Sequence, residues 1–147
     1  MMNARKVKVS CRVCGTTNFY PLDSAGKKVV CGRCRSDLPE PGTVLELSVD
    51  GFYKMIQTSS LPVLVDFFSP TCGPCHLMHP IVERLAQRRA GELMVVRFNI
   101  DLAPGVATGF RVHAVPTFLI VHKGLERARS TGAMSETDFS LWVASAA

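Results

Sequence analysis

The chain has 147 residues, of which 47% are hydrophobic, enough for one filled globular domain and a small appendage. No apolar run approaches the roughly 20 residues of a membrane helix, and no apolar signal segment follows the basic N-terminus. We therefore expect a cytoplasmic protein without membrane contact. The net charge of +5 arises wholly in residues 1–40, because residues 41–147 hold nine charges of each sign. So small an excess is weak evidence for nucleic acid, and we do not expect nucleic-acid binding.

The six cysteines form three C-x-x-C pairs, which without a secretory signal indicate metal or redox chemistry in a reducing compartment. Sixteen residues separate the first two pairs, the spacing of a tetrahedral four-thiolate zinc site formed by Cys11, Cys14, Cys31 and Cys34. Gly15 and Gly32 lie where tight knuckle turns need a permissive backbone. The surrounding segment is too poor in apolar residues for a core, so we expect one structural zinc ion to stabilise it. Four reduced or adventitiously paired cysteines are the alternative.

The polar segment 36–43 contains two prolines and a glycine and predicts a linker between a zinc module, residues 1–40, and a main domain, residues 41–147. Continuous apolar runs and apolar residues three or four apart predict the elements of the main domain. The first elements in chain order are an edge strand at 44–47, a helix at 49–58, a buried strand at 63–68 and a long helix from 72 to about 89. Pro80 should kink this long helix. A strand at 93–100, a short helix at 104–110, two hairpin strands at 118–121 and 126–131, and a helix at 136–144 follow. This order predicts a mixed sheet with helices on both faces.

The third cysteine pair, Cys72 and Cys75, lies at the predicted start of the long helix. Pro74 suits the first helical turn, where a missing N–H has no helical partner to lose. Unpaired N–H groups and the helix dipole favour a thiolate at Cys72. Cys75 lies one turn further, close enough to attack a mixed disulfide formed at Cys72. The pattern predicts a dithiol–disulfide switch.

Asp66 is embedded in the apolar run V-L-V-D-F-F and is the only carboxylate between Asp50 and Glu83. Burial should raise its pKa, so that it can take a proton from Cys75 near neutral pH. The alternative is a purely structural ion pair.

The sequence C-G-P-C-H also matches the c-type haem attachment pattern. We do not adopt that interpretation, because no export signal is visible and the strand and helix already account for both cysteines. We likewise set aside a metal site at Cys72, Cys75, His76 and His79. We expect His76 to be a partly exposed neighbour that tunes the thiolate.

Short motifs recur in a fixed order along residues 44–147: V-D-F (65–67), C-G-P-C (72–75), Pro80, N-I-D (99–101), V-P-T (115–117), K-G (123–124) and Gly132. Their order and spacing resemble the thioredoxin family. The preceding double C-x-x-C is similar to the zinc module of the second, zinc-bearing type of bacterial thioredoxin. The resemblance thus covers nearly the whole chain.

The resemblance implies an α/β thioredoxin fold, with a central five-stranded mixed sheet flanked by four helices and a small N-terminal module that is similar to a zinc ribbon. It also implies that Cys72 attacks and Cys75 resolves, with a redox disulfide Cys72–Cys75, that Asp66 lies beneath the pair, and that Pro116 is a cis-proline. Substrate contacts would come from Gly73, Pro74, Val115, Pro116 and Thr117. The implied partners are disulfide-bearing proteins and a thioredoxin reductase, and we expect a monomer.

The chain departs from the family at the rim of this site. Thr71 and Phe68 occupy positions where tryptophan is usual, and His76 replaces a frequent lysine. These departures concern partner choice more than the reaction. A second hypothesis makes the zinc module the working part, as a binding module or redox sensor, with the main domain as its scaffold. Only Phe19 and Tyr20 are available there for base stacking, which argues against nucleic acid.

Overall fold

The computed structural model describes residues 6–11, 13–21, 29–38 and 42–147. The expected domain boundary at residue 40 therefore lies outside the described residues. The N-terminal module contains an antiparallel pair of strands, β1 (Lys6–Ser10) and β2 (Thr17–Pro21). The turn with Cys11 and Cys14 connects β1 to β2, and the turn with Cys31 and Cys34 comes after β2. Neither strand was among the elements predicted from the sequence.

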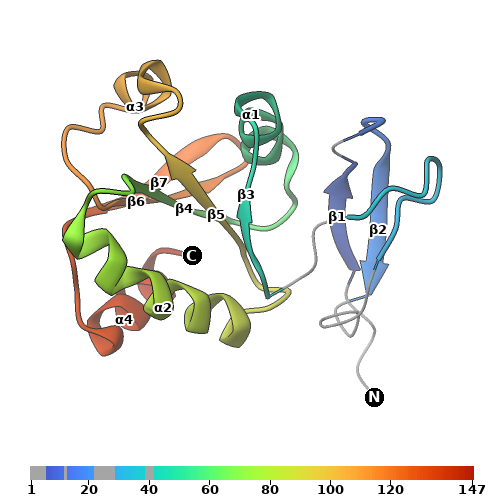
Figure 1. The fold of residues 1–147 in the computed structure, drawn as a ribbon. Coiled ribbons are helices and arrows are strands. Elements are labelled where there is room, and N and C mark those ends of the chain that lie inside the picture. The colour runs from blue at the N-terminus through green and yellow to red at the C-terminus, as the bar shows by residue number, and fades with distance from the viewer. Residues whose placement is uncertain (1–5, 12, 22–28, 39–41) are drawn as a thin grey trace.

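The main domain is built on one five-stranded mixed sheet, as expected (Figure 1). Its strands are β3 (Val44–Glu46), β4 (Val63–Phe68), β5 (Met94–Asn99), β6 (Thr117–His122) and β7 (Leu125–Thr131). They lie in the order β3-β5-β4-β6-β7. The first three are parallel, whereas β6 and β7 run antiparallel to their neighbours. Every residue of β4 is buried, because this strand lies at the centre of the sheet with both faces covered.

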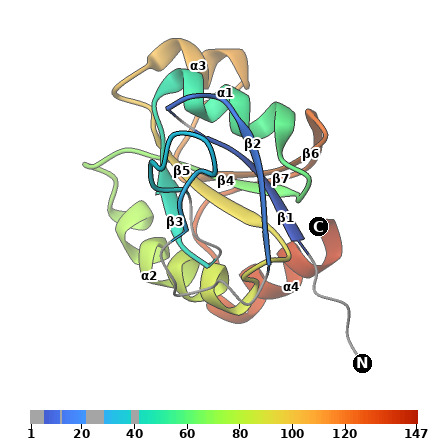
Figure 2. The same cartoon turned by 90° about the vertical axis from the view of Figure 1, so that its right-hand side faces the viewer.

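Four helices cover the two faces of this sheet: α1 (Val49–Thr58), α2 (Gly73–Arg88), α3 (Pro104–Gly109) and α4 (Glu136–Ala146). Helices α1 and α3 pack on one face and α2 and α4 on the other (Figures 1 and 2). Ser48 and Ser135 begin α1 and α4 by accepting backbone N–H groups of the first turn. Helix α2 continues through Pro80 as one helix. Within the described part of the chain, no helix has both the length and the apolar character to cross a membrane.

The N-terminal module lies beside α1 (Figures 1 and 2). Cys11 and Cys31 are completely buried, and they belong to the same apolar cluster as Phe52, Met55 and Ile56 of α1. The cysteine turns are therefore continuous with the core on this face of the sheet.

Candidate active site

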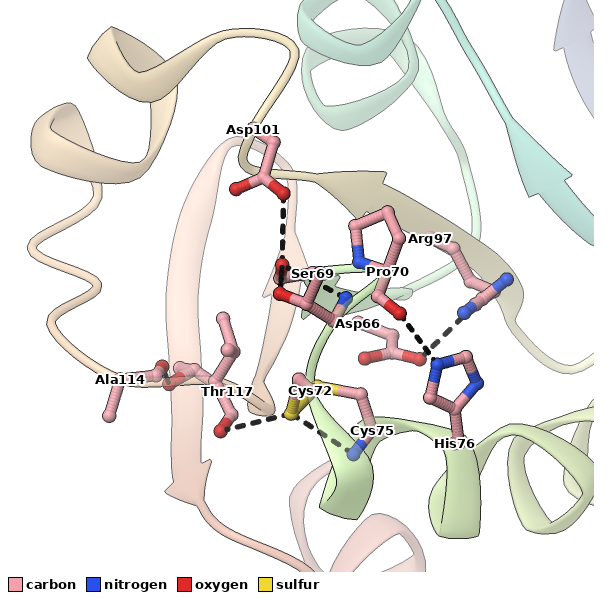
Figure 3. Close-up of a disulfide and its surroundings, with 12 residues drawn as sticks. Asp66, Ser69, Pro70, Cys72, Cys75, His76, Arg97, Asp101, Ala114 and Thr117 are labelled. Carbon is pink, nitrogen blue, oxygen red and sulfur yellow. Dashed lines mark hydrogen bonds and ion pairs between the residues drawn. A yellow bond between two sulfur atoms is a disulfide. The ribbon is translucent and has the colours of Figure 1, made fainter.

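Cys72 and Cys75 lie at the N-terminal end of α2 and are joined by a disulfide, with their Cα atoms 5.2 Å apart (Figure 3). Cys72 is the N-cap residue and is half-buried, whereas Cys75 is 3% exposed. The backbone N–H of Cys75 donates to Cys72 Sγ at 3.2 Å. This N–H group and the helix dipole would stabilise a thiolate at Cys72 in the reduced protein. The accessible sulfur is thus the one with the better-stabilised anion.

The loop before β6 faces this disulfide. Its Val115–Pro116 peptide bond is cis, as the family resemblance implied. The carbonyl oxygen of Val115 lies 3.6 Å from Cys72 Sγ. Thr117 is buried, and its hydroxyl donates to the carbonyl of Ala114 at 2.6 Å, which fixes the loop from behind.

The five expected substrate-contact residues differ in how accessible they are. Gly73 and Pro74 are exposed and Val115 is half-buried, whereas Pro116 and Thr117 are buried. An incoming chain could therefore reach the backbone at Val115 and the start of α2. Thr117 instead has the environment of a residue that holds the loop in place.

The segment that precedes Cys72 is held by four side chains, of which Ser69 and Asp101 were not among the expected site residues (Figure 3). Ser69 donates to Asp101 Oδ2 at 2.9 Å, and its hydroxyl lies 3.1 Å from that of Thr71. His76 Nε2 lies 2.7 Å from the carbonyl oxygen of Pro70. His76 is exposed, as expected, but the contact it makes is with the loop backbone. These bonds fix the position from which Cys72 enters the helix.

Asp66 lies on β4, the strand that leads into the loop before Cys72, and is 1% exposed. Its register partner on the parallel strand β5 is Arg97, whose Nε lies 3.6 Å from Asp66 Oδ2, an ion pair longer than a hydrogen bond. The Arg97 guanidinium also stacks on the Phe68 ring, 3.8 Å from its centroid. Burial raises the pKa of Asp66 to about 6, although the charge of Arg97 opposes this shift. The carboxylate has both an ion pair and a pKa close to neutral, so the two interpretations of Asp66 are compatible.

Arg97 is the main residue that sequence analysis missed here. The available signal was that Arg97 is the only charge in the apolar strand 93–100, as Asp66 is in strand 63–68. Only the register of the two strands shows that these two charges lie side by side.

The four N-terminal cysteines converge to a second cluster. Their sulfur atoms all lie within 4.8 Å of one another, with Cys11 and Cys34 at 3.5 Å and Cys14 and Cys31 at 3.6 Å. Tetrahedral thiolates about 2.3 Å from a zinc ion would be about 3.8 Å apart. The cluster therefore has the size and donor set of a metal site.

The two C-x-x-C turns have the same backbone geometry. In each turn, the first cysteine N–H donates to the carbonyl five residues on, and its carbonyl accepts the N–H four residues on. The residue four positions after each first cysteine has a positive φ: Gly15 at 77° and Arg35 at 65°. The expectation for Gly15 is confirmed, whereas the one for Gly32 is wrong, because the left-handed position of the second turn is Arg35.

Polar groups around this cluster favour thiolates at two of its cysteines. The backbone N–H of Cys34 and the side-chain amide of Asn18 lower the pKa of Cys31 to about 6. The Ser36 hydroxyl and backbone N–H lower the pKa of Cys34. Thiolates are the form in which cysteine binds metal.

A disulfide at a helix N-terminus, faced by a cis-proline on a mixed sheet of this topology, defines the class of thiol–disulfide exchange proteins with a thioredoxin fold. The thioredoxin family model matches residues 43–145. The chain therefore belongs to the thioredoxin family, and its enzymatic class is that of the disulfide reductases.

Individual relatives agree with this assignment. Thioredoxin C-3 of Corynebacterium nephridii is 29% identical over 135 residues, 92% of each chain, so this similarity extends into the N-terminal module. The thioredoxin of Acidithiobacillus ferridurans is 36% identical over 68% of this chain and 93% of its own. Among solved structures, a mutant thioredoxin from Halobacterium salinarum NRC-1 has the same fold, with a TM-score of 0.66 and 24% identity over 74% of this chain and 94% of that one.

Proposed function

We propose that the protein reduces disulfide bonds in other proteins through Cys72 and Cys75, and that it contains one structural zinc ion. The observation that carries the first part is the asymmetry of the pair. Cys72 is the more accessible sulfur and receives the N–H of Cys75, whereas Cys75 is buried close to it. Such a pair suits attack by the first cysteine and resolution by the second.

In the proposed reaction, the Cys72 thiolate attacks one sulfur of a substrate disulfide, and the other substrate sulfur leaves as a thiolate. Asp66 takes the proton of the Cys75 thiol, because its pKa of about 6 suits exchange near neutral pH. The Cys75 thiolate then attacks Cys72 in the mixed disulfide. The second substrate sulfur leaves, and the Cys72–Cys75 disulfide forms. Two electrons pass from the protein dithiol to the substrate.

Substrate segments would bind in an extended conformation beside Val115. Its carbonyl oxygen is 3.6 Å from Cys72 Sγ, so a strand-like backbone pairing there would bring a substrate sulfur to Cys72. The exposed Gly73 and Pro74 would form the opposite side of this contact. Pro116 and Thr117 would shape the loop from inside.

The zinc ion would be bound by Cys11, Cys14, Cys31 and Cys34. With four protein ligands, such a site has no position for a substrate, which is typical of structural zinc. The alternative role is redox sensing: oxidation of these thiolates would release the metal and loosen the module. Zinc that stays bound under peroxide until the protein unfolds would contradict this role.

A thioredoxin reductase would return the disulfide to the dithiol. A relative in Mycobacterium leprae is described as a bifunctional thioredoxin reductase/thioredoxin, and it is 32% identical over 67% of this chain and 21% of its own length. We propose such a reductase as the partner of this chain. The chain itself would act as a cytoplasmic monomer.

The midpoint potential of the Cys72–Cys75 pair tests the proposal. Thiol trapping across graded dithiothreitol buffers would measure it, with Cys72→Ser as the blank. A potential near the value of about −270 mV known for thioredoxin supports a reductase, whereas about −180 mV or higher indicates an oxidant or isomerase. If no reversible titration occurs, the function would move to the zinc module. Loss of activity in Cys11→Ser but not in Cys72→Ser would confirm that change.

A further inference from the structure

The proposed reaction leaves one proton on Asp66 in every turnover, and the structure restricts how this proton can leave. Asp66 is 1% exposed, and its ion-pair partner is Arg97. Arginine keeps its proton at any physiological pH, so Arg97 cannot relay a proton by losing its own. A titratable group on the solvent side of Arg97 is needed.

Such groups line a pocket of about 370 Å³ that includes residues of α2, β3 and β5. Arg97, the ion-pair partner of Asp66, forms part of the pocket wall. Its other charged or titratable lining residues are His79 and Glu83 from α2 and Glu46 from β3. A polar pocket of this size holds water.

Three buried polar atoms along this path have no hydrogen-bond partner among the described residues: Asp66 Oδ1, Arg97 Nε and His79 Nδ1. Buried polar atoms are usually paired with protein or with water. Two of these atoms belong to Arg97 and His79, which line the pocket, and Asp66 lies behind Arg97, so water that enters from the pocket as these side chains move would pair them.

The orientation of His79 follows from its neighbour. His79 Nε2 lies 2.9 Å from Glu83 Oε1. Because a carboxylate only accepts hydrogen bonds, Nε2 carries the hydrogen, and Nδ1 of the neutral ring has a lone pair. Nδ1 is the buried atom, whereas the side chain as a whole is 39% exposed.

We propose that this pocket is the proton-exchange route of Asp66 and that His79, oriented by Glu83, accepts the departing proton at Nδ1. This inference rests on the proposed function. When the Arg97 side chain moves aside, pocket water reaches the protonated Asp66 carboxyl and takes its proton, and that water passes one to Nδ1. The imidazolium then loses a proton to solvent through its exposed part. No electrons move, and Asp66 regains its charge beside Arg97. His79 is a positioning and relay residue that acts through Asp66.

Quench-flow with glutathione disulfide as the probe separates the two chemical steps. Acid stops the exchange, and mass spectrometry of the intact protein then counts the reduced, glutathionylated and oxidised forms. Formation of the mixed disulfide depends on probe concentration and reports Cys72. Its decay does not depend on concentration and reports Cys75 and Asp66.

In His79→Asn, we expect the decay to slow by about tenfold at pH 7, less than the roughly hundredfold or more that loss of the general base itself would cost. Formation should keep its rate. The difference should disappear near pH 9, where hydroxide can take the proton directly, and added imidazole should restore the decay at pH 7. Glu83→Ala should slow the decay less, and Glu83→Gln, whose amide oxygen still accepts from Nε2, should restore it. His122→Asn, a histidine outside this pocket, is the matched control and should match the wild type.

An unchanged decay rate in His79→Asn from pH 6 to 9 would overturn the inference, and so would an equal slowing of both steps, which indicates a structural effect. Glu83 is half exposed, so its variants keep the test valid if His79→Asn folds poorly. If the wild type forms neither the mixed disulfide nor the Cys72–Cys75 disulfide, the proposed function itself fails.

Discussion

Asp66 is a buried carboxyl group whose ionisation should govern how stability depends on pH. Burial raises its pKa from 3.8 to about 6 in the folded protein. Between these two values the folded state binds more protons than the unfolded state, so the free energy of unfolding falls as the pH rises. Above about pH 6 the full cost of burying the charge is present, and a shift of this size corresponds to about 3 kcal/mol.

Asp66→Asn removes this titration. We expect the variant, compared in the oxidised form with the wild type, to gain up to about 3 kcal/mol in relative stability between pH 4 and pH 8. Urea unfolding at a series of pH values measures the difference. Parallel stability curves for the two proteins would show that Asp66 does not titrate in this range.

Residues that act through their own sequence neighbours were predictable, whereas residues that act across strands were not. Cys72, Pro74 and Cys75 lie within four consecutive residues, so the properties of a helix N-terminus were enough to predict a dithiol at the start of α2. Arg97 is 31 positions from Asp66, and their contact depends on the register of β4 and β5. The metal site that included His79 was set aside, and the place of His79 in one pocket with Arg97 is visible only in the packed structure.

At the level of elements, α2 and α4 are linked by a cluster of exposed charges. Arg84 and Arg88 of α2 both bind Glu136 in the first turn of α4, at 2.9 and 3.1 Å. The hydrogen bonds from Arg84 and then Arg88 lower the pKa of Glu136 to about 2. A lowered carboxyl pKa stabilises the fold above the ordinary value of 4.5, and this contribution is lost as the pH falls toward 2.

Glu136→Gln should therefore lower the melting temperature slightly, by about 1–3 °C at pH 7 and low salt, because exposed ion pairs contribute little. The difference should vanish in about 1 M salt, where charges are screened within about 3 Å, and also near pH 2. Scanning calorimetry under these conditions measures it. A difference that persists in high salt would indicate packing of α4 and not charge.

The predicted elements of the main domain agree with the structure to within a few residues, because their apolar patterns are long. The strands of the N-terminal module were missed. Residues 6–10 read K-V-K-V-S, an alternation typical of a strand, but five residues are a weak signal. The two C-x-x-C turns come together when β1 pairs with β2, which requires the folded module. The cis state of Pro116 was implied by the family resemblance and not by any local pattern.

At the scale of the whole molecule, the contact between the N-terminal module and α1 determines how the module is connected to the rest of the fold. Cys11, Cys31 and Leu38 share an apolar cluster with Phe52 and Ile56. The active-site helix α2 lies on the opposite face of the sheet (Figure 1). Zinc bound by the module, as proposed, would therefore have no direct contact with the dithiol.

Removal of zinc by a chelator under reducing conditions should unfold the module, because its four thiolates then repel one another and its apolar residues are few. Hydrogen exchange should show lost protection in β1, β2 and residues 29–38, with a smaller loss in α1. Strands β4 and β5 should stay protected, and the rate of disulfide exchange at Cys72 should change by no more than about twofold. The wild type with zinc restored is the control. If β4 also loses protection or exchange stops, the module and the sheet form one cooperative unit, and zinc would then be needed for catalysis as well as for folding of the module.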